Sequence, residues 1–175
     1  MIRSNKTVTY RLRAVDTTGL LQLIDDSADV QLPSIDKMTD TVKGAGILGE
    51  IDMPSLGQIA SMTMTVNFKA DNPAYAKLAR PGFINLELVW VVDVINTTTR
   101  ATTVQQHKAF ATVLNKKYNP GKIEAGATTD GSSEFEVSAY RKVVDGLEVM
   151  NIDKLNSIFS VDGTDYMAQV NALTM

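Results

Sequence analysis

The chain contains no cysteine and only one histidine, His107. Without cysteine it forms no disulfide, no thiolate zinc site, no iron–sulfur cluster and no cysteine nucleophile. One histidine cannot build a multi-histidine metal site, and a Ser–His–acid triad would have to use that single residue. We therefore predict no catalytic residue, no cofactor site and no metal site, and expect a protein that is not an enzyme. A hydrolase with a concealed site remains an alternative, ranked after the two interpretations given at the end of this subsection.

Long apolar runs and a basic surplus are also missing. The most apolar segment, residues 83–95, is interrupted by Glu87 and Asp93 and is shorter than the roughly 20 apolar residues of a spanning helix. Residues 1–6 lack the apolar region of a signal peptide, so we expect a protein made in the cytoplasm without a membrane anchor. The net charge of −3 is the opposite of what a free-standing nucleic-acid-binding protein carries.

The sequence does have alternation of period two. In residues 61–69 apolar side chains alternate with polar ones, which is typical of a strand with one face on a core. The apolar set is Met62, Met64, Val66 and Phe68, and the polar set is Ser61, Thr63, Thr65, Asn67 and Lys69. Residues 84–95 and 104–116 predict a long hairpin, and Asp145-Gly146 predicts the tight turn of another.

Helix signals are few. Residues 72–80 begin with an N-cap asparagine followed by proline, which predicts a short helix, and residues 164–173 are a weaker helical segment. The 175 residues are 44% hydrophobic, enough for one core. We therefore predict a single domain over residues 1–175 that is mainly β. Its expected architecture is an antiparallel β-sandwich or barrel with one flanking helix and a short C-terminal helix.

Residues 44–49 read Gly-Ala-Gly-Ile-Leu-Gly, which matches the G-x-G-x-x-G pattern of dinucleotide-binding loops. That chemistry needs a buried strand before the glycines and a helix opening on them, because the helix N-terminus holds the phosphates. Here residues 35–43 are mostly polar, and Pro54 and Gly57 follow too soon for a full helix. We therefore interpret the glycines as a compliant turn between two strands.

The order of these segments resembles the major tail tube protein family of contractile phage tails and R-type bacteriocin (tailocin) particles. The resemblance runs from about Val30 to the end of the chain. It rests on "VQLP", the polar strand at residues 35–43, "KGAGILGEIDMP", "LGQI" and "SMTMTVNF", followed by "FEVSAYRKVVDGLEV" and "IDKLNSIFSVDGTDY".

This resemblance implies a non-enzymatic subunit of the inner tail tube. Six protomers would form a ring with a continuous inner β-barrel, and stacked rings would form a hollow tube that sheath contraction drives through the target envelope. The implied partners are other copies of the chain, the sheath protein, the baseplate hub and the tape measure, with transient passage of DNA in a phage. The implied location is a virion or tailocin tail.

Two sets of residues become candidates for this role. The turn would contact a neighbouring ring or subunit through Lys43, Gly44, Gly46, Ile47, Leu48, Gly49 and Glu50. The polar face of the alternating strand would face the lumen through Ser61, Thr63, Thr65 and Asn67. The alternative is a monomeric β-sandwich module that binds carbohydrate or protein. The single tryptophan, Trp90, lies on the apolar face of its strand, which weakens the carbohydrate-binding alternative.

Overall fold

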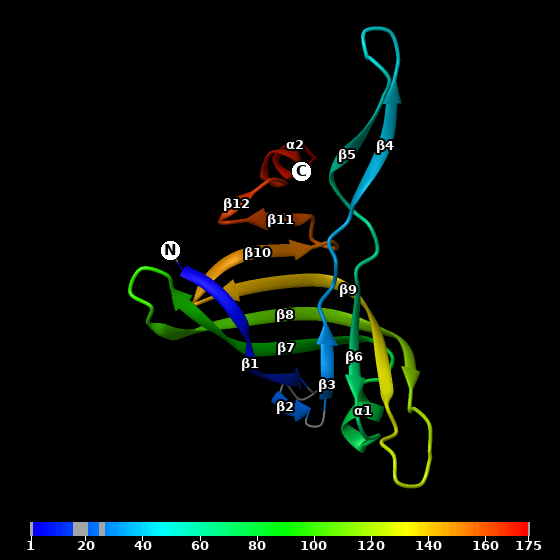
Figure 1. The fold of residues 1–175 in the computed structure, drawn as a ribbon. Coiled ribbons are helices and arrows are strands. Elements are labelled where there is room, and N and C mark those ends of the chain that lie inside the picture. The colour runs from blue at the N-terminus through cyan, green and yellow to red at the C-terminus, as the bar shows by residue number, and fades with distance from the viewer. Residues whose placement is uncertain (1, 16–20, 25–26, 175) are drawn as a thin grey trace.

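The computed structural model describes residues 2–15, 21–24 and 27–174. These residues form mainly antiparallel strands and two short helices (Figure 1). In chain order the elements are β1 (Ile2–Val15), β2 (Leu21–Ile24), β3 (Ser27–Gln31), β4 (Lys37–Lys43), β5 (Glu50–Ile59), β6 (Thr63–Phe68), α1 (Pro73–Lys77), β7 (Phe83–Asn96), β8 (Thr102–Asn119), β9 (Gly131–Val144), β10 (Leu147–Asp153), β11 (Ile158–Val161), β12 (Thr164–Asp165) and α2 (Ala168–Thr174).

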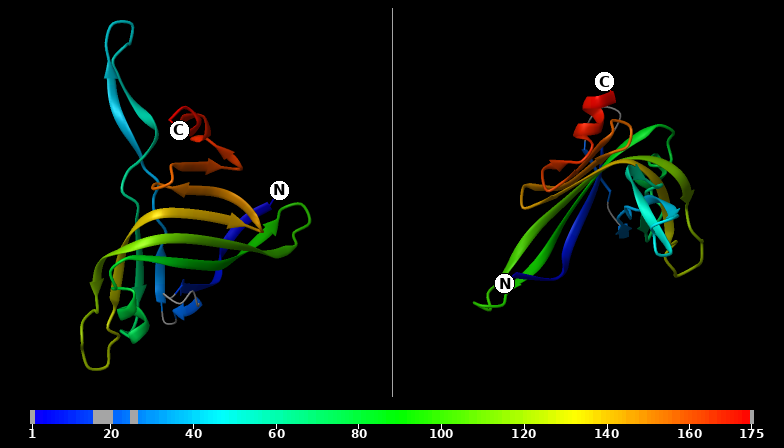
Figure 2. Two further views of the ribbon diagram at one scale, coloured as in Figure 1. Left: turned by 180° about the vertical axis from the view of Figure 1, so that it is seen from behind. Right: turned by 90° about the horizontal axis from the view of Figure 1, so that it is seen from above.

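Most of the described strands belong to one curled sheet. Its main path runs β12-β11-β10-β9-β8-β7-β1-β2, and β6 and β3 are attached beside β9. The long strands β7, β8 and β9 curve across the molecule, while β3 and β6 cross them on one side (Figures 1 and 2). The remaining strands, β4 and β5, pair only with each other and form a ribbon that projects from the body.

Strand β9 changes partner along one of its edges. Its first half pairs with β6, from Gly131 opposite Phe68 to Glu136 opposite Thr63. Its second half pairs with β10, from Ala139 opposite Asp153 to Val144 opposite Leu147. The sheet therefore branches near residues 137 and 138 of β9. The chain enters β6 from the projecting ribbon at this branch point.

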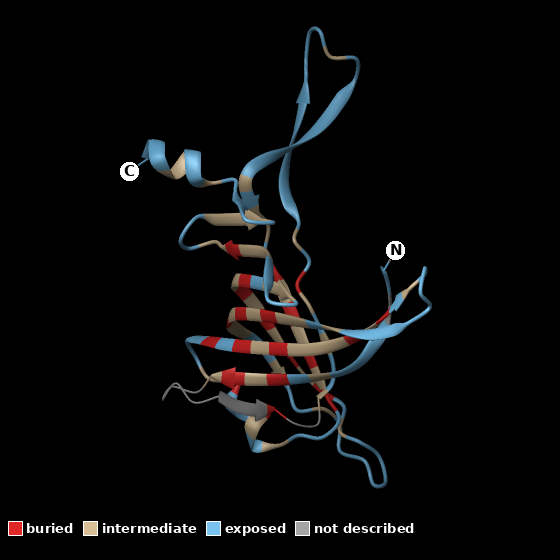
Figure 3. Cartoon of the chain, turned by 90° about the vertical axis from the view of Figure 1, so that its left-hand side faces the viewer, coloured by how far each residue is buried: buried red, intermediate tan, exposed pale blue. Residues whose placement is uncertain are grey.

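The core lies between the crossing strands and the long strands. Alternate residues of β6 are buried, as the period-two pattern predicts, and they pack with alternate residues of β7 and β8. Helix α1 covers one end of this core, where the Tyr75 ring stacks on Phe68 with centroids 4.0 Å apart. Asn72 caps that helix by accepting hydrogen bonds from the N–H groups of Ala74 and Tyr75. Buried residues are confined to the body, and the ribbon is exposed throughout most of its length (Figure 3).

The predicted fold class is confirmed, and so are its main local features. Strands β7 and β8 form the expected long hairpin. Asp145 and Gly146 both have positive φ, 47° and 83°, as the tight turn between β9 and β10 requires. Neither helix in the described part of the chain is long and apolar enough to cross a membrane.

Two boundaries differ from the sequence-based expectation. Residues 50–59 form strand β5, a separate strand that the sequence did not predict before the alternating segment at residues 61–69. Pro54 lies opposite Thr39 in this two-stranded ribbon, both strands of which are edge strands, the setting in which sheets accommodate proline. The expected helix at residues 164–173 is divided: Thr164 and Asp165 pair with β11, and the helix begins only at Ala168.

Candidate assembly surface

The ribbon of β4 and β5, called the arm below, is the most exposed element of the described structure. The two strands pair from Lys37 opposite Ile59 to Lys43 opposite Glu50. Every residue of β4 is exposed, and so are most residues of β5. An isolated two-stranded hairpin is marginally stable in water. The arm therefore lacks the packing that holds the rest of the fold together.

The arm nevertheless carries apolar side chains. Leu48 is fully exposed at the tip, and five others along the arm are between 38% and 66% exposed: Met38, Val42, Ile51, Met53 and Leu56. Single exposed apolar residues are ordinary, but a group on one projecting element indicates a surface that another molecule covers. The arm also has two unpaired strand edges, which folded proteins usually cover or protect.

The tip contains all seven residues that the sequence singled out for assembly. Lys43 and Glu50 end the two strands and form an exposed ion pair of 3.4 Å. Between them the Ile47 N–H donates to the Gly44 carbonyl over 3.1 Å, and Gly46 and Gly49 have φ of 90° and 97°. The glycines thus supply left-handed backbone for a tight turn. Strand β5 follows the turn directly, so the helix that phosphate binding needs is replaced by a strand.

The base of the arm is fixed to the body by a small polar cluster. The Lys154 ammonium donates to the Ala60 carbonyl over 2.8 Å and lies 3.5 Å from Glu136. The Ser61 hydroxyl donates to the same carboxylate over 2.5 Å, and Ala60 N–H donates to the Asp36 carbonyl. Ala60 and Ser61 connect the arm to β6, while Glu136 lies on β9. This base cluster therefore joins the arm to the branch point of the sheet.

The electrostatics of the base cluster favour an ionised Glu136. Burial alone would raise the pKa of this carboxyl, but the Ser61 hydrogen bond and the Lys154 charge outweigh burial and lower the pKa. Lys116, 3.9 Å from Glu136, acts in the same direction. The carboxylate is thus charged, and accepts hydrogen bonds, throughout the neutral range.

The candidate lumen-facing residues share the outer face of β6. Ser61 is exposed, whereas Thr63, Thr65 and Asn67 are half-buried. Asn67 donates to the Asp29 carboxylate over 2.7 Å, and the Lys116 ammonium donates to the Thr63 hydroxyl over 3.5 Å. These residues of β6 and the preceding Ser61 therefore form one polar surface, in which Ser61, Thr63 and Asn67 bond to side chains of β9, β8 and β3.

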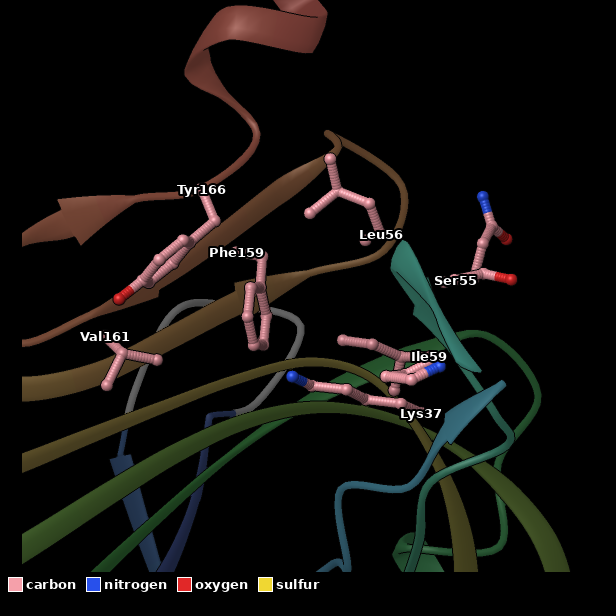
Figure 4. Close-up of a pocket in the computed structure, with 10 residues that line it drawn as sticks. Lys37, Ser55, Leu56, Ile59, Phe159, Val161 and Tyr166 are labelled. Carbon is pink, nitrogen blue, oxygen red and sulfur yellow. The ribbon is translucent and has the colours of Figure 1, made fainter. Parts of the chain in front are cut away.

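A groove of about 440 Å³ lies beside the base of the arm. Leu56 and Ile59 of β5 face Phe159 and Val161 of β11 across it, with Tyr166 at one side (Figure 4). The Lys37 ammonium lies 5.8 Å from the centre of the Phe159 ring. Gly57 also borders the groove, and its backbone is in close contact with the Met167 side chain. The groove is thus mainly apolar with one cation at its edge.

Sequence reasoning missed the base cluster and the groove. Lys154 and Ala60 are 94 residues apart, and the segment that contains Lys154 contributes to the family resemblance but gives no sign of this partner. The alternating pattern of residues 61–69 pointed to β6 but carried no signal for its side-chain partners on β9 and beyond. The groove arises only when the arm base meets β11, a pairing of surfaces that no local pattern specifies.

Comparisons with known proteins agree with a tail-tube architecture. The family described as phage tail tube protein FII matches residues 21–173. No curated protein matches the chain in sequence. The fold is similar to a chain in the cryo-EM structure of an extracellular contractile injection system, the PVC sheath/tube terminator in the extended state. That similarity has a TM-score of 0.51 at 10% identity and covers 78% of this chain and 94% of that chain.

A second solved structure shows the same similarity. It is a chain in the cryo-EM structure of the anti-feeding prophage baseplate, 6-fold symmetrised, with a TM-score of 0.51 at 11% identity. The match covers 81% of this chain and 97% of the other. At such low identity the likeness concerns the fold. It nevertheless extends over nearly the whole of both related chains.

Proposed function

Because this chain belongs to the phage tail tube protein FII family, a structural component of phage tails, we propose that it forms the inner tail tube by self-assembly. In this proposal six copies form a ring with a continuous inner β-barrel, and rings stack into a hollow tube. Contraction of a surrounding sheath drives the tube through the target envelope. The tube carries no catalytic activity and belongs to a phage tail or a tailocin, assembled in the cytoplasm.

The observation that carries this proposal is the arm. It exposes apolar side chains and two strand edges that nothing in its own protomer covers among the described residues. Ring formation and stacking would remove both liabilities, because closed barrels have no free edges. Sixfold assembly is also supported by the similarity to a chain of a 6-fold symmetrised baseplate. The proposed partners are further copies of this chain, the sheath protein, the baseplate hub and the tape measure, with transient DNA passage in a phage.

Negative-stain electron microscopy of the purified protein tests the proposal directly. We expect rings or hollow fibres of uniform diameter, and a variant in which residues 37–59 are replaced by a short Gly/Ser linker should stay monomeric. A wild-type protein that remains monodisperse at all concentrations, even with a baseplate nucleus, would instead favour the monomeric binding module.

Hydrogen exchange tests the role of the arm tip. We propose that residues 43–50 are mobile in the free protomer and ordered by a neighbouring ring or subunit in the tube. Their amides should exchange rapidly in protomers and slowly in tubes, whereas amides of β8 should be protected in both states. Equal protection of the tip in the two states would contradict the assembly role.

The lumen face is a separate proposal. We propose that Ser61, Thr63, Thr65 and Asn67 face the lumen, because this surface is polar and three of its four side chains are held by hydrogen bonds. The opposite outer face, on β7 and β8, carries Asn85 and Thr112, joined by a 2.9 Å hydrogen bond. The two faces lie on opposite sides of the core, so only one of them can line the lumen.

Cysteine labelling distinguishes the two faces, since the wild-type chain has no cysteine. Thr65→Cys and Asn85→Cys are labelled in assembled tubes with a small maleimide and with a bulky polymer-linked one. We expect Thr65→Cys to react with the small reagent but not with the bulky one. Asn85→Cys should not show this selective exclusion of the bulky reagent. Selective exclusion of the bulky reagent from Asn85→Cys would assign the lumen to β7 and β8 instead.

A further inference from the structure

The groove beside the arm base has the properties of a receptor for an apolar segment. Its volume is about 440 Å³. An engineered apolar cavity of roughly 150 Å³ holds benzene, so the groove has room for at least one apolar side chain. Aliphatic and aromatic side chains line it on both sides (Figure 4). The Met167 side chain lies against Gly57, next to the groove, and connects the arm base to the segment before α2.

The same chain carries an apolar group suited to this groove. Leu48 is fully exposed at the arm tip, with Ile47 beside it. The paired strands keep the arm extended, so its tip lies far from its own base (Figure 1). A tip therefore cannot reach the groove of its own protomer, but it can reach that of another copy.

The charges at the two places are complementary. The tip presents Lys43 and Glu50 side by side on its two strands. The groove has Lys37 at the edge formed by the arm. On its other side, Val161 and Tyr166 flank residues 162–165, which include the exposed Asp162 and Asp165 but do not themselves line the groove. The Asp165 carboxylate also accepts a hydrogen bond from the Met167 N–H. A docked tip would therefore place Glu50 toward Lys37 and Lys43 toward the two aspartates.

We propose that the groove is the receptor for the arm tip of a second copy, with Leu48 inserted between β5 and β11. This inference rests on the proposed function, because it assigns the contact through which tube subunits join. The tip and the groove are different surfaces of one chain, so the contact is heterologous. Each copy donates one tip and offers one groove. Such contacts can link any number of copies, either in a closed ring or in an open helical assembly.

Disulfide trapping tests the contact in a chain that has no native cysteine. Leu48→Cys combined with Val161→Cys should give, after mild oxidation of assembled protein, a ladder of covalent oligomers on a non-reducing gel. The matched control pairs Leu48→Cys with Ile123→Cys, in the loop between β8 and β9 and itself 93% exposed. The control should yield monomers only.

The outcomes separate this inference from the proposed function. Absence of tubes from the wild-type protein would overturn the proposed function and this inference with it. Normal tubes without a 48–161 ladder would overturn the docking site alone. If the Leu48→Cys/Ile123→Cys pair gave a ladder and the Leu48→Cys/Val161→Cys pair did not, the receptor would be the β8–β9 loop. That result would also overturn the proposed docking site in the groove.

A charge exchange provides a second test that does not need oxidation. Glu50→Lys and Lys37→Glu, each alone, should raise the critical concentration for assembly several-fold, because each places like charges together. The double variant should return toward the wild-type value, and Lys122→Glu at a remote exposed pair should leave it unchanged. Leu48→Ala should raise it roughly tenfold or more, since a buried leucine is lost. A double variant no better than either single variant would contradict the proposed pairing.

Discussion

The ammonium group of Lys154 lies 2.8 Å from the carbonyl oxygen of Ala60, across 94 residues of sequence, and joins the turn after β10 to the base of the arm. The backbone N–H of Lys154 donates at the same time to the Ser138 carbonyl over 3.0 Å. One residue therefore connects the arm to the point where β9 exchanges β6 for β10. We expect this contact to help set the direction in which the arm leaves the body, together with the contacts that the arm base makes with Phe159 and Met167.

Replacing Lys154 should loosen the arm without unfolding the body. Lys154→Met keeps the apolar stem but removes the donor to Ala60 and the charge beside Glu136. Both side chains are about a quarter to a third exposed, so we expect a loss of only about 1 kcal/mol in the free energy of unfolding. Spin labels attached at Leu48→Cys and Lys117→Cys report the distance between the arm tip and β8. The distribution of this distance should be broader in Lys154→Met than in the wild type.

The control for that measurement is Lys122→Met, which removes a lysine from an ion pair in the exposed loop before β9. It should leave the distance distribution as narrow as in the wild type. An unchanged distribution in Lys154→Met would show that the arm direction is set elsewhere, for example by Met167 against Gly57.

Acid should loosen the same base cluster. The folded-state pKa of Glu136 is lowered below its ordinary 4.5, so its ionised form is stabilised on folding. This stabilisation is fully present above pH 4.5 and is lost as the pH falls through the lower, folded-state pKa. The spin-label distribution should therefore broaden below pH 4.5 in the wild type, and less so in Glu136→Gln. Broadening that begins near neutral pH would assign the transition to another group.

A second stability prediction concerns Gly131, where β9 begins. A β-carbon at this position would lie 2.1 Å from the Phe68 ring and 2.7 Å from the Asn119 carbonyl oxygen. Phe68 is buried and stacked on Tyr75, so it has little room to move. Gly131→Ala should cost about 3 kcal/mol in urea denaturation of the protomer. Gly44→Ala, where a β-carbon meets no atom within 4 Å, should cost under about 1 kcal/mol.

The sequence predicted those parts of the fold in which one local pattern determines the structure. Strand β6 follows from alternation, because one of its faces is buried, and the Asp145-Gly146 turn follows from the need for positive φ at both residues. The position of the glycine turn was also predicted, from glycines that follow the polar segment at residues 35–43 and precede Pro54.

Strand β5 shows why the rest could not be predicted. In this strand only Gly57 and Ile59 are half-buried and the other residues are exposed, so no burial pattern runs along residues 50–59. Residues 50–53 do alternate between polar and apolar side chains, but Pro54 and Gly57 interrupt the pattern. The base cluster and the groove depend on contacts between segments about 100 residues apart, which the curvature of the sheet brings together. Local residue patterns do not predict how strongly a sheet curves.

The glycine tip offers a test of assembly that is separate from folding. Gly46 has φ of 90°, a conformation that a β-branched residue rarely adopts, whereas Gly44 has no positive φ. Both positions are open to solvent, so Gly46→Val and Gly44→Val add the same bulk and differ in backbone strain. The tip lies outside the core, so the free energy of unfolding of both variants should be within about 1 kcal/mol of the wild-type value.

In Gly46→Val the turn must change shape, which would displace Leu48 and the Lys43–Glu50 pair. We expect its tubes to be short or absent in sedimentation and electron microscopy, with Gly44→Val closer to the wild type. Normal tubes from Gly46→Val would show that the conformation of this turn is not required for assembly.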